Sequence, residues 1–312
     1  FMIFVTGGCG FIGSNFVHFL KEKTDEPIVV LDKFTYASSL NNLNPVEVDV
    51  VKVDLADKSS LLEVFSSYKP SKIFHFAAES HVDSSIEDVM PFVDSNIIGT
   101  INLLKLSCDY DVEMFHHIST DEVYGSLQYD EKSFTETTPY SPLNPYSASK
   151  AASDHFVMSF HNTYGIPVKI TNCSNNYGPR QHKEKLIPKV ILNAIRGEKI
   201  PVYGNGENIR DWIYVEDHCS AVYEVFLNGK VGQKYNIGGE NEFKNIDIVK
   251  NILSILNKDE HLIEYVQDRP GHDLRYSIDN AKIKEELNWS PKYSLQEGLE
   301  KTIKWYYEFY SL

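Results

Sequence analysis

Cysteine and long apolar runs are both scarce in this chain. Four cysteines occur among 312 residues, and they lie far apart with no Cys-x-x-Cys pair. Such spacing is typical of reduced thiols and argues against a disulfide framework or a zinc site. No apolar run approaches the roughly 20 residues needed to cross a bilayer. We therefore expect a cytoplasmic protein with no membrane segment and no bound metal.

Basic residues are also in deficit. Lys and Arg number 30 against 44 Asp and Glu, which gives a formal net charge of −14. A surface of this sign repels nucleic acid and anionic membranes, so neither is expected as a partner. The sequence has no internal repeat and no low-complexity segment. Its length fits one large domain or two linked ones.

A glycine motif follows the first apolar run. Residues 2–6 predict a strand, Gly7, Gly10 and Gly13 fit Gly-x-x-Gly-x-x-Gly, and residues 14–20 predict a helix. Glycines at this spacing allow a tight turn and a close approach of backbone N–H groups to a pyrophosphate. The pattern therefore predicts a dinucleotide site at the start of this helix.

The second apolar run, residues 28–31, ends at Asp32, nineteen residues after Gly13. An acid at this place accepts hydrogen bonds from the adenosine ribose and repels a 2′-phosphate, so NAD is favoured over NADP. Strand, glycines, helix, second strand and acid occur in register. That combination favours a cofactor site over a simple turn.

Strands and helices alternate through the first half of the chain. The expected strands are 48–53, 72–77, 115–119 and 167–172, and the expected helices are 58–68, 91–110 and 146–164. This alternation predicts an α/β fold with a doubly wound parallel sheet of Rossmann type, and ligands at the carboxyl ends of its strands. We expect residues 1–172 to form an NAD-binding domain, with return segments near 209–238. Residues 173–312 would form a smaller α/β substrate domain.

The candidate catalytic residues follow the strand at 115–119. Asn144 and Pro145 predict the start of a helix on which Tyr146 and Lys150 share one face. We expect the ammonium to lower the pKa of the phenol, which would make Tyr146 a base for a sugar hydroxyl. Thr120 and the carboxylate pair Asp121 and Glu122 lie at the preceding strand end. A carboxylate pair beside the tyrosine indicates that a proton and a leaving group are handled too.

Histidines are the tempting candidates for a metal site. His75, His81, His116 and His117 match no zinc-ligand spacing. Alternation within strands instead predicts that His75 and His116 are core or edge residues.

At this point the residues indicate a family. The chain resembles the extended short-chain dehydrogenase/reductases and, within them, the dTDP-glucose 4,6-dehydratases. The segments that support this are residues 6–14, 31–37, 77–83, 119–125, 146–151, 173–179, 184–188, 210–212 and 268–273. The glycine loop and Tyr-x-x-x-Lys are common to the superfamily. Thr-Asp-Glu and Asp-Arg-Pro-Gly-His are narrower, and they favour a dehydratase over a 4-epimerase.

The resemblance implies a mechanism. Thr120 and Tyr146 would bind the glucose 4-hydroxyl, and Tyr146 would take its proton while C4 passes a hydride to NAD⁺. Glu122 would then remove the C5 proton, and Asp121 would protonate the departing 6-hydroxyl. Return of the hydride to C6 gives a 4-keto-6-deoxy nucleotide sugar, a precursor of deoxysugars such as rhamnose.

The resemblance also implies binding residues. Besides the three glycines, contacts to NAD would come from Phe11, Ile12, Asp32, Lys33, Thr35, Asp54, Leu55, Ala77, Ser95, Tyr146, Lys150 and Asn176. Contacts to the dTDP-sugar would come from Ser80, Thr120, Asn175, Lys185, Leu186, Pro201, Tyr203, Arg210, Asn245, Arg269 and His272. Arginine guanidinium groups suit a diphosphate.

The chain departs from the family at Ser84, which stands where arginine is common, and at His182 and Lys183, which replace Phe-Pro. The second change lies in the loop expected over the nucleotide, so UDP- or CDP-glucose stays open as the substrate. A nucleotide-sugar 4-epimerase or decarboxylase using the same tyrosine and NAD is the alternative enzyme. An inactive NAD-binding protein is a third possibility, although it would be expected to have lost Tyr146 or Lys150.

A homodimer is expected as well. The helices 91–110 and 146–164 have apolar residues beyond the side that faces the sheet, namely Ile97, Ile101, Leu104, Phe156, Met158 and Phe160. Relatives pair these helices with their copies in a four-helix interface, and twofold symmetry is the commonest arrangement.

Overall fold

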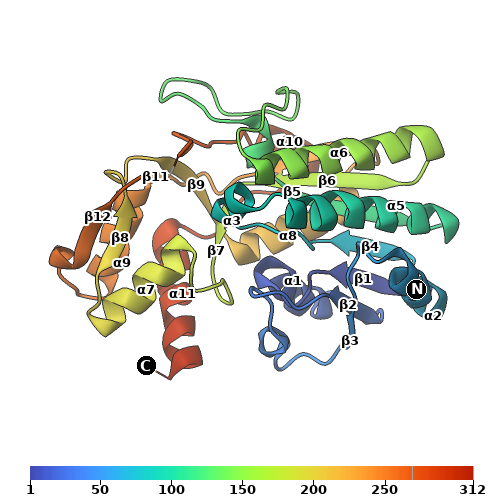
Figure 1. The fold of residues 1–312 in the computed structure, drawn as a ribbon, viewed down its shortest axis with the longest axis horizontal. Coiled ribbons are helices and arrows are strands. Elements are labelled where there is room, and N and C mark those ends of the chain that lie inside the picture. The colour runs from blue at the N-terminus through green and yellow to red at the C-terminus, as the bar shows by residue number, and fades with distance from the viewer. Residues whose placement is uncertain (269, 312) are drawn as a thin grey trace.

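A parallel sheet of seven strands organises the molecule. The computed structural model describes residues 1–268 and 270–311. The strand order is β10-β6-β5-β4-β1-β2-β3, and all neighbouring strands are parallel (Figure 1). The strands are β1 (Ile3–Thr6), β2 (Ile28–Asp32), β3 (Asp49–Lys52), β4 (Lys72–His75), β5 (Met114–Thr120), β6 (Val168–Cys173) and β10 (Gln233–Ile237). The order reverses between β1 and β4, as in a doubly wound sheet. The predicted fold class is confirmed.

Helices cover both faces of this sheet (Figure 1). One face packs against α1 (Phe11–Lys21) and α8 (Val215–Asn228), and the other against α2 (Lys58–Tyr68), α5 (Gly99–Asp109) and α6 (Pro145–Tyr164). Because both faces are buried, β1 and β2 are apolar up to their last residues, Thr6 and Asp32, and do not alternate with polar residues.

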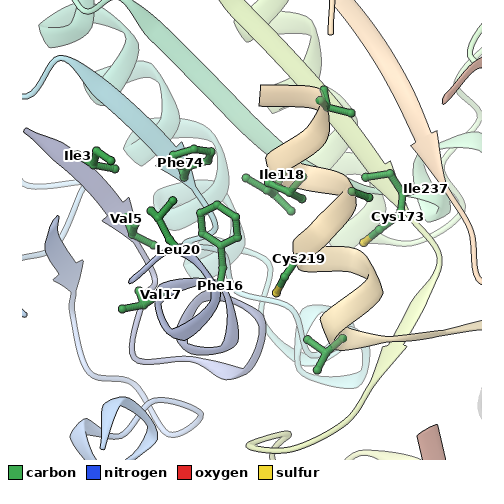
Figure 2. Packing of buried hydrophobic residues seen from close by; sticks show 14 of the residues in the cluster. Ile3, Val5, Phe16, Val17, Leu20, Phe74, Ile118, Cys173, Cys219 and Ile237 are labelled. Atoms are coloured by element: carbon green, nitrogen blue, oxygen red, sulfur yellow. The ribbon is translucent and has the colours of Figure 1, made fainter. Parts of the chain in front are cut away.

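Neighbouring residues of β1 belong to different cores. Val5 packs with the cluster of α1 and α8, whereas Phe4 packs with the cluster of α2, α5 and α6. Figure 2 shows the first cluster, in which Phe16 and Leu20 of α1 lie beside Val5, and Cys219 projects from α8. The helices packed on the two faces of the sheet hold the strand ends in fixed positions. The candidate site is built on those ends.

The expected helix 91–110 contains a wide turn. It consists of α4 (Met90–Phe92), the π-helical turn η2 (Val93–Ile98) and α5. Asn96 lies in this turn and bonds to both backbone groups of Glu79, at 2.8 Å and 3.0 Å. Its own carbonyl accepts from the Thr100 hydroxyl at 2.6 Å. Single π turns occur frequently at functional sites.

The later residues form a smaller part with its own core. Its sheets are β11-β9-β7 and β12-β8, from β7 (Asn175–Tyr177), β8 (Ile200–Tyr203), β9 (Ile209–Tyr214), β11 (Glu242–Lys244) and β12 (Ile263–Val266). The helices α7 (Leu186–Arg196), α9 (Asn245–Ile255) and α11 (Leu295–Tyr310) enclose its core. β10 returns to the large sheet beside β6, whereas β9 stays in the smaller part. The domain boundary at residue 172 stays a prediction.

The remaining elements are short. They are η1 (Leu40–Leu43), α3 (Val82–Glu87), η3 (Asp121–Tyr124), η4 (Glu260–Leu262) and α10 (Ala281–Leu287). Among the described residues, no helix is both long enough and apolar enough to cross a membrane.

Candidate active site

A cleft lies over the carboxyl ends of the large sheet's strands. It is lined by every residue that we expect to contact NAD and by all five candidate catalytic residues. Four expected substrate residues also line it, namely Ser80, Thr120, Asn175 and Lys185. The structure therefore brings most of the predicted site into one space. That each of these residues contacts a ligand stays a prediction.

The glycine loop forms one wall of the cleft. Gly7 has a φ of +66°, and a Cβ there would lie 2.7 Å from the Cα of Ala77. A Cβ on Gly13 would lie 2.2 Å from the carbonyl oxygen of Gly7. Gly10 caps α1 without a side-chain hydrogen bond, and the first turn of α1 has no acidic side chain. The start of the helix is thus open to an anion, which its dipole and N–H groups favour.

Asp32 ends β2 with its carboxylate fixed by two backbone donors. Oδ2 accepts from the N–H of Cys9 at 3.0 Å, and Oδ1 accepts from the N–H of Phe34 at 2.8 Å. The residue is 7% exposed and lines the cleft. An acceptor with this position and charge suits ribose hydroxyls and repels a 2′-phosphate.

Lys33 reaches across the cleft to the π turn. Its Nζ donates to Ser95 Oγ at 2.5 Å and lies 3.5 Å from Glu79 Oε1. Asn96, the next residue of η2, holds the backbone of Glu79. The wide turn therefore positions two sides of the cleft at once.

The helix α6 begins where the sequence predicts. Asn144 accepts from the N–H of Ser147 at 2.8 Å, Ser147 Oγ accepts from the N–H of Asn144 at 3.2 Å, and Pro145 occupies the first turn. This capping box stabilises the end of the helix that presents Tyr146 to the cleft. One turn later, Lys150 Nζ donates to the carbonyl of Ile118 at 2.9 Å, and both side chains are buried.

The expectation that Tyr146 has a lowered pKa is wrong, because the net effect of the protein's own residues is to raise it. Burial raises the pKa of Tyr146 well above its ordinary value, and the charges of Glu122 and Asp121 raise it further. A hydrogen bond with Thr120 acts in the opposite direction. Burial is the largest of these effects, and the Lys150 ammonium donates to a backbone carbonyl of β5. Deprotonation of Tyr146 therefore requires additional positive charge in the cleft.

Asp121 and Glu122 begin the 3-10 turn η3 at the end of β5. Thr120 caps this turn by accepting from the N–H of Glu122 at 3.2 Å. Burial raises the pKa of Asp121 well above its ordinary value, as do the charges of Glu122 and Asp211, while Arg210 partly opposes them. Asp121 is 1% exposed, and its Oδ2 has no hydrogen-bond partner among the described residues. The protonated form of Asp121 is favoured, which suits a general acid.

The other expected substrate residues lie outside the lining of the cleft, on the smaller part. Leu186 begins α7, Pro201 and Tyr203 lie on β8, Arg210 on β9, Asn245 begins α9, and His272 lies in the loop before α10. Arg269 lies outside the described residues. The predicted substrate contacts therefore divide between the cleft and a second group of residues.

Two members of this second group lie together, and a third acts on the catalytic turn through its charge. The rings of Tyr203 and His272 lie 6.2 Å apart and nearly perpendicular, and His272 Nδ1 lies 2.7 Å from Asp268 Oδ1. The Arg210 guanidinium lies 4.5 Å from the centre of the Tyr276 ring. The charge of Arg210 acts to lower the pKa of Asp121, which links this one residue to the acid pair.

The sequence analysis missed several residues of the cleft. They include Tyr36, Ala37, Ser38, Glu79, His81, Ser119, Ser174 and Gln181. Most come from loops after β2, β4 and β6. The rings of Tyr36 and His182 meet edge to face at 5.5 Å, so the altered His-Lys loop borders the mouth of the cleft. A signal was available, since loops at the carboxyl ends of parallel strands line such sites.

The four cysteines are free thiols, and Cys9, Cys173 and Cys219 are buried. His75 and His116 are buried in the sheet, as their strand positions predict. In residues 1–268 and 270–311, no group of three or more His, Cys, Asp or Glu residues is arranged to hold a metal ion.

A glycine-lined cleft on a doubly wound sheet, with a Tyr-x-x-x-Lys helix at its edge, defines a dinucleotide-dependent α/β enzyme of the short-chain dehydrogenase/reductase type. Residues 4–302 match the family described as GDP-mannose 4,6 dehydratase, and the chain belongs to that family. The resemblance inferred from the sequence is confirmed.

Individual relatives make the comparison more specific. A dTDP-glucose 4,6-dehydratase from Neisseria gonorrhoeae is 48% identical over 328 residues, which cover 97% of this chain and 95% of that protein. The crystal structure of a dTDP-glucose 4,6-dehydratase from Bacillus anthracis, in complex with NAD, is 44% identical with a TM-score of 0.91 and covers 98% of this chain and 96% of that chain.

An epimerase has the same fold at lower identity. The UDP-glucose 4-epimerase from Thermotoga maritima is 30% identical with a TM-score of 0.94 and covers 99% of this chain and all of that chain (100%). The fold therefore does not separate dehydratases from epimerases. Sequence identity is higher to the dehydratases, at 44% and 48% against 30%.

Proposed function

We propose that this chain is an NAD-dependent 4,6-dehydratase that converts dTDP-glucose to dTDP-4-keto-6-deoxyglucose and water. One observation supports this most strongly. The Tyr146 and Lys150 pair and the Asp121 and Glu122 pair line the same cleft, and burial raises the pKa of Asp121. Oxidation of an alcohol needs the first pair, whereas loss of water needs an acid and a base in addition.

The residues present fit NAD. The glycine loop leaves room for a pyrophosphate against the start of α1, and Asp32 offers an acceptor for ribose hydroxyls. When bound, NAD⁺ supplies the hydride acceptor and donor, and a positive charge that lowers the pKa of the Tyr146 phenol. Lys33, Ser95 and Asn176 border the same space.

The chain's own groups move the protons. Tyr146, hydrogen-bonded to Thr120, takes the proton of the 4-hydroxyl as C4 is oxidised. The new ketone acidifies the C5 proton, which Glu122 removes. Asp121 donates its proton to the 6-hydroxyl, which leaves as water. Glu122 returns its proton to C5 as C6 is reduced, and the 4-keto-6-deoxy sugar is complete. Tyr146 then releases the proton that it took, and Asp121 regains one, so the net products are the keto sugar and water.

The nucleotide would bind between the cleft and the second group of residues. Oδ1 of Asn175 and Oδ1 of Asn245 are buried acceptors without a hydrogen-bond partner among the described residues. Such groups are costly unless a ligand or water satisfies them. The buried guanidinium of Arg210 supplies positive charge suited to a diphosphate.

A homodimer through α5 and α6 is part of the proposal, as is a cytoplasmic location. Phe156 is 38% exposed and Ile98 is 39% exposed on these helical segments. Leu104 and Phe160, which the sequence suggested for the interface, instead pack in the core of their own chain. The exposed apolar surface is therefore smaller than expected. It still includes Tyr164 at the end of α6, which is 65% exposed.

Product analysis tests the function directly. Purified protein is incubated with dTDP-glucose, UDP-glucose, CDP-glucose or GDP-mannose, and the alkaline absorbance of a 4-keto-6-deoxy sugar is followed. Product should form fastest from dTDP-glucose, and Tyr146→Phe should abolish it. Formation of the C4 epimer without the alkaline absorbance would favour the epimerase instead.

A further inference from the structure

A buried acid lies directly behind the catalytic lysine. Asp154 is one helical turn after Lys150 on α6, and both residues are almost fully buried, at 1% and 4% exposure. Residues at i and i+4 lie on the same face of a helix. Asp154 does not line the cleft, so it contacts neither the proposed cofactor nor the sugar.

Three elements hold the Asp154 carboxylate in place. Oδ2 accepts from the Tyr140 hydroxyl at 2.7 Å and from the Asn172 amide at 3.2 Å, and Oδ1 lies 3.1 Å from His117 Nε2. Asn172 also donates to the carbonyl of Thr120 at 3.0 Å. The carboxylate is therefore bound to β5, to β6 and to the loop before α6.

The electrostatics of this cluster favour a charged carboxylate. Burial alone would raise the pKa of Asp154, but its contact with His117 and the charge of Lys150 hold it below its ordinary value. The pKa of His117 is lowered, by burial and by Lys150. The neighbouring Asp154 carboxylate partly opposes this lowering of the His117 pKa.

Lys150 needs such a partner. Burial lowers its pKa, and Asp154 is the strongest of the charges that oppose this effect. A buried ammonium without a counter-ion costs several kcal/mol in practice. The carbonyl of Ile118 supplies one hydrogen bond to Nζ but no charge.

We infer that Asp154 is a positioning residue for the proposed reaction, because its buried carboxylate is the counter-ion that keeps Lys150 charged behind Tyr146. This inference rests on the proposed function for its catalytic meaning. The effect of the Asp154 charge on Lys150 does not depend on that function. Asp154 acts only through Lys150 and is not itself a catalytic residue.

Other titratable groups surround the pair. They are His75 on β4, His117 on β5, Cys173 on β6, Tyr124 in η3, Tyr140 in the loop before α6, Tyr146 on α6 and Lys234 on β10. The histidines have lowered pKa values, and the tyrosines and Cys173 have raised ones. Among the charges that act on the pKa of Lys150, Asp154 has the largest effect, and Cys173 acts in the same direction.

The first test is the pH dependence of kcat with dTDP-glucose. Asp154→Asn keeps the shape and can keep the contacts to Tyr140 and Asn172, but it removes the charge. The alkaline limb, where Lys150 loses its proton, should move down by about 1–3 pH units. Asp154→Glu retains the charge and should keep the limb near its wild-type position. A merely structural role would lower kcat without moving the limb.

The second test needs no cofactor or substrate. The free energy of unfolding is measured for wild type, Asp154→Asn, Lys150→Met and the double variant. If the two charges compensate each other, removal of Lys150 should restore stability to Asp154→Asn, or restore folding if that variant does not fold.

The outcomes are separable. An unshifted alkaline limb, or a double variant no more stable than Asp154→Asn, overturns the inference. Absence of wild-type turnover contradicts the proposed function instead, and the unfolding comparison then still decides whether Asp154 is the counter-ion of Lys150.

Discussion

Loss of Asp121 or Glu122 should separate oxidation from elimination. Asp121→Asn and Glu122→Gln keep size and most hydrogen bonds while removing acid or base capacity. Asp121 is buried, and its pKa is raised well above its ordinary value. An amide at this position has nearly the same size, so the fold should tolerate it.

The size of the effect follows from the role of the two groups. General acid and base catalysis typically contributes about 10²–10⁴ in rate. This corresponds to about 2.7–5.4 kcal/mol in the barrier for elimination. Overall turnover should fall by that factor in each variant. The barrier for oxidation at C4 should change little, because Tyr146 and Lys150 remain.

Rapid mixing with dTDP-glucose measures both stages. In each carboxylate variant the absorbance of NADH should build up and decay slowly, whereas the wild type should show little. Tyr146→Phe is the matched control, since it should depress NADH and product together. Normal turnover in both carboxylate variants would refute the assignment and favour an epimerase. Collapse of product formation without any NADH would also refute it, because oxidation would then have failed as well.

Three further predictions concern cofactor choice, acid stability and assembly. Asp32→Asn removes a charged acceptor whose hydrogen bonds are worth about 1.5–3 kcal/mol. Calorimetry should therefore show NAD binding weakened by about 10–150-fold and discrimination against NADP reduced. Unchanged NAD affinity would contradict the site. His218 is buried and its pKa is lowered to about 3. Its contribution to stability is full above pH 6.5 and is lost as pH falls toward 3, by about 2.7 kcal/mol between pH 6.5 and 4.5. Urea unfolding of His218→Gln should therefore depend less on pH over this range, and a wild-type-like slope would count against it. Light scattering should give a dimer that Phe156→Asp weakens, and a wild-type monomer that is stable to dilution would rule out the interface.

Local signals in the sequence were sufficient for most of the large sheet. Apolar runs such as residues 28–31 identify strands because both faces of a parallel sheet are buried. The start of α6 could be predicted for a different reason. Asn144 and Pro145 stabilise the first turn of the helix through local contacts alone, so the sequence by itself indicates where the helix begins.

Features that depend on distant residues were not readable. The π turn at η2 depends on bonds between Asn96 and the backbone of Glu79, seventeen residues away. The direction of the Tyr146 pKa depends on burial and on how close Asp121 and Glu122 lie, and spacing within one helix reveals neither. The wrong expectation for the Tyr146 pKa considered only Lys150 on the same helix. It left out burial and the carboxylates that follow β5.

The division of the substrate residues has the same origin. Ser80 and Lys185 reach the cleft from loops, and Lys185 Nζ donates to the carbonyl of Ser80 at 3.3 Å. Tyr203 and Asn245 belong to elements of the smaller part, whose packing against the sheet no local pattern specifies. Motifs therefore identified the residues, while the fold alone decides which of them share a space.

The wide turn at η2 changes the direction in which side chains point around the helix axis, so the segments before and after it present different faces. Each residue of an α-helix advances the side chains by about 100°. A π turn contains one residue more than an α turn, so Ser95 can line the cleft while Leu103 and Leu104 of α5 face the core. Deleting a single residue between Val93 and Ile98 would close the turn, and one of these two surfaces would rotate out of register. The number of residues in this segment therefore determines which side chains face the cleft.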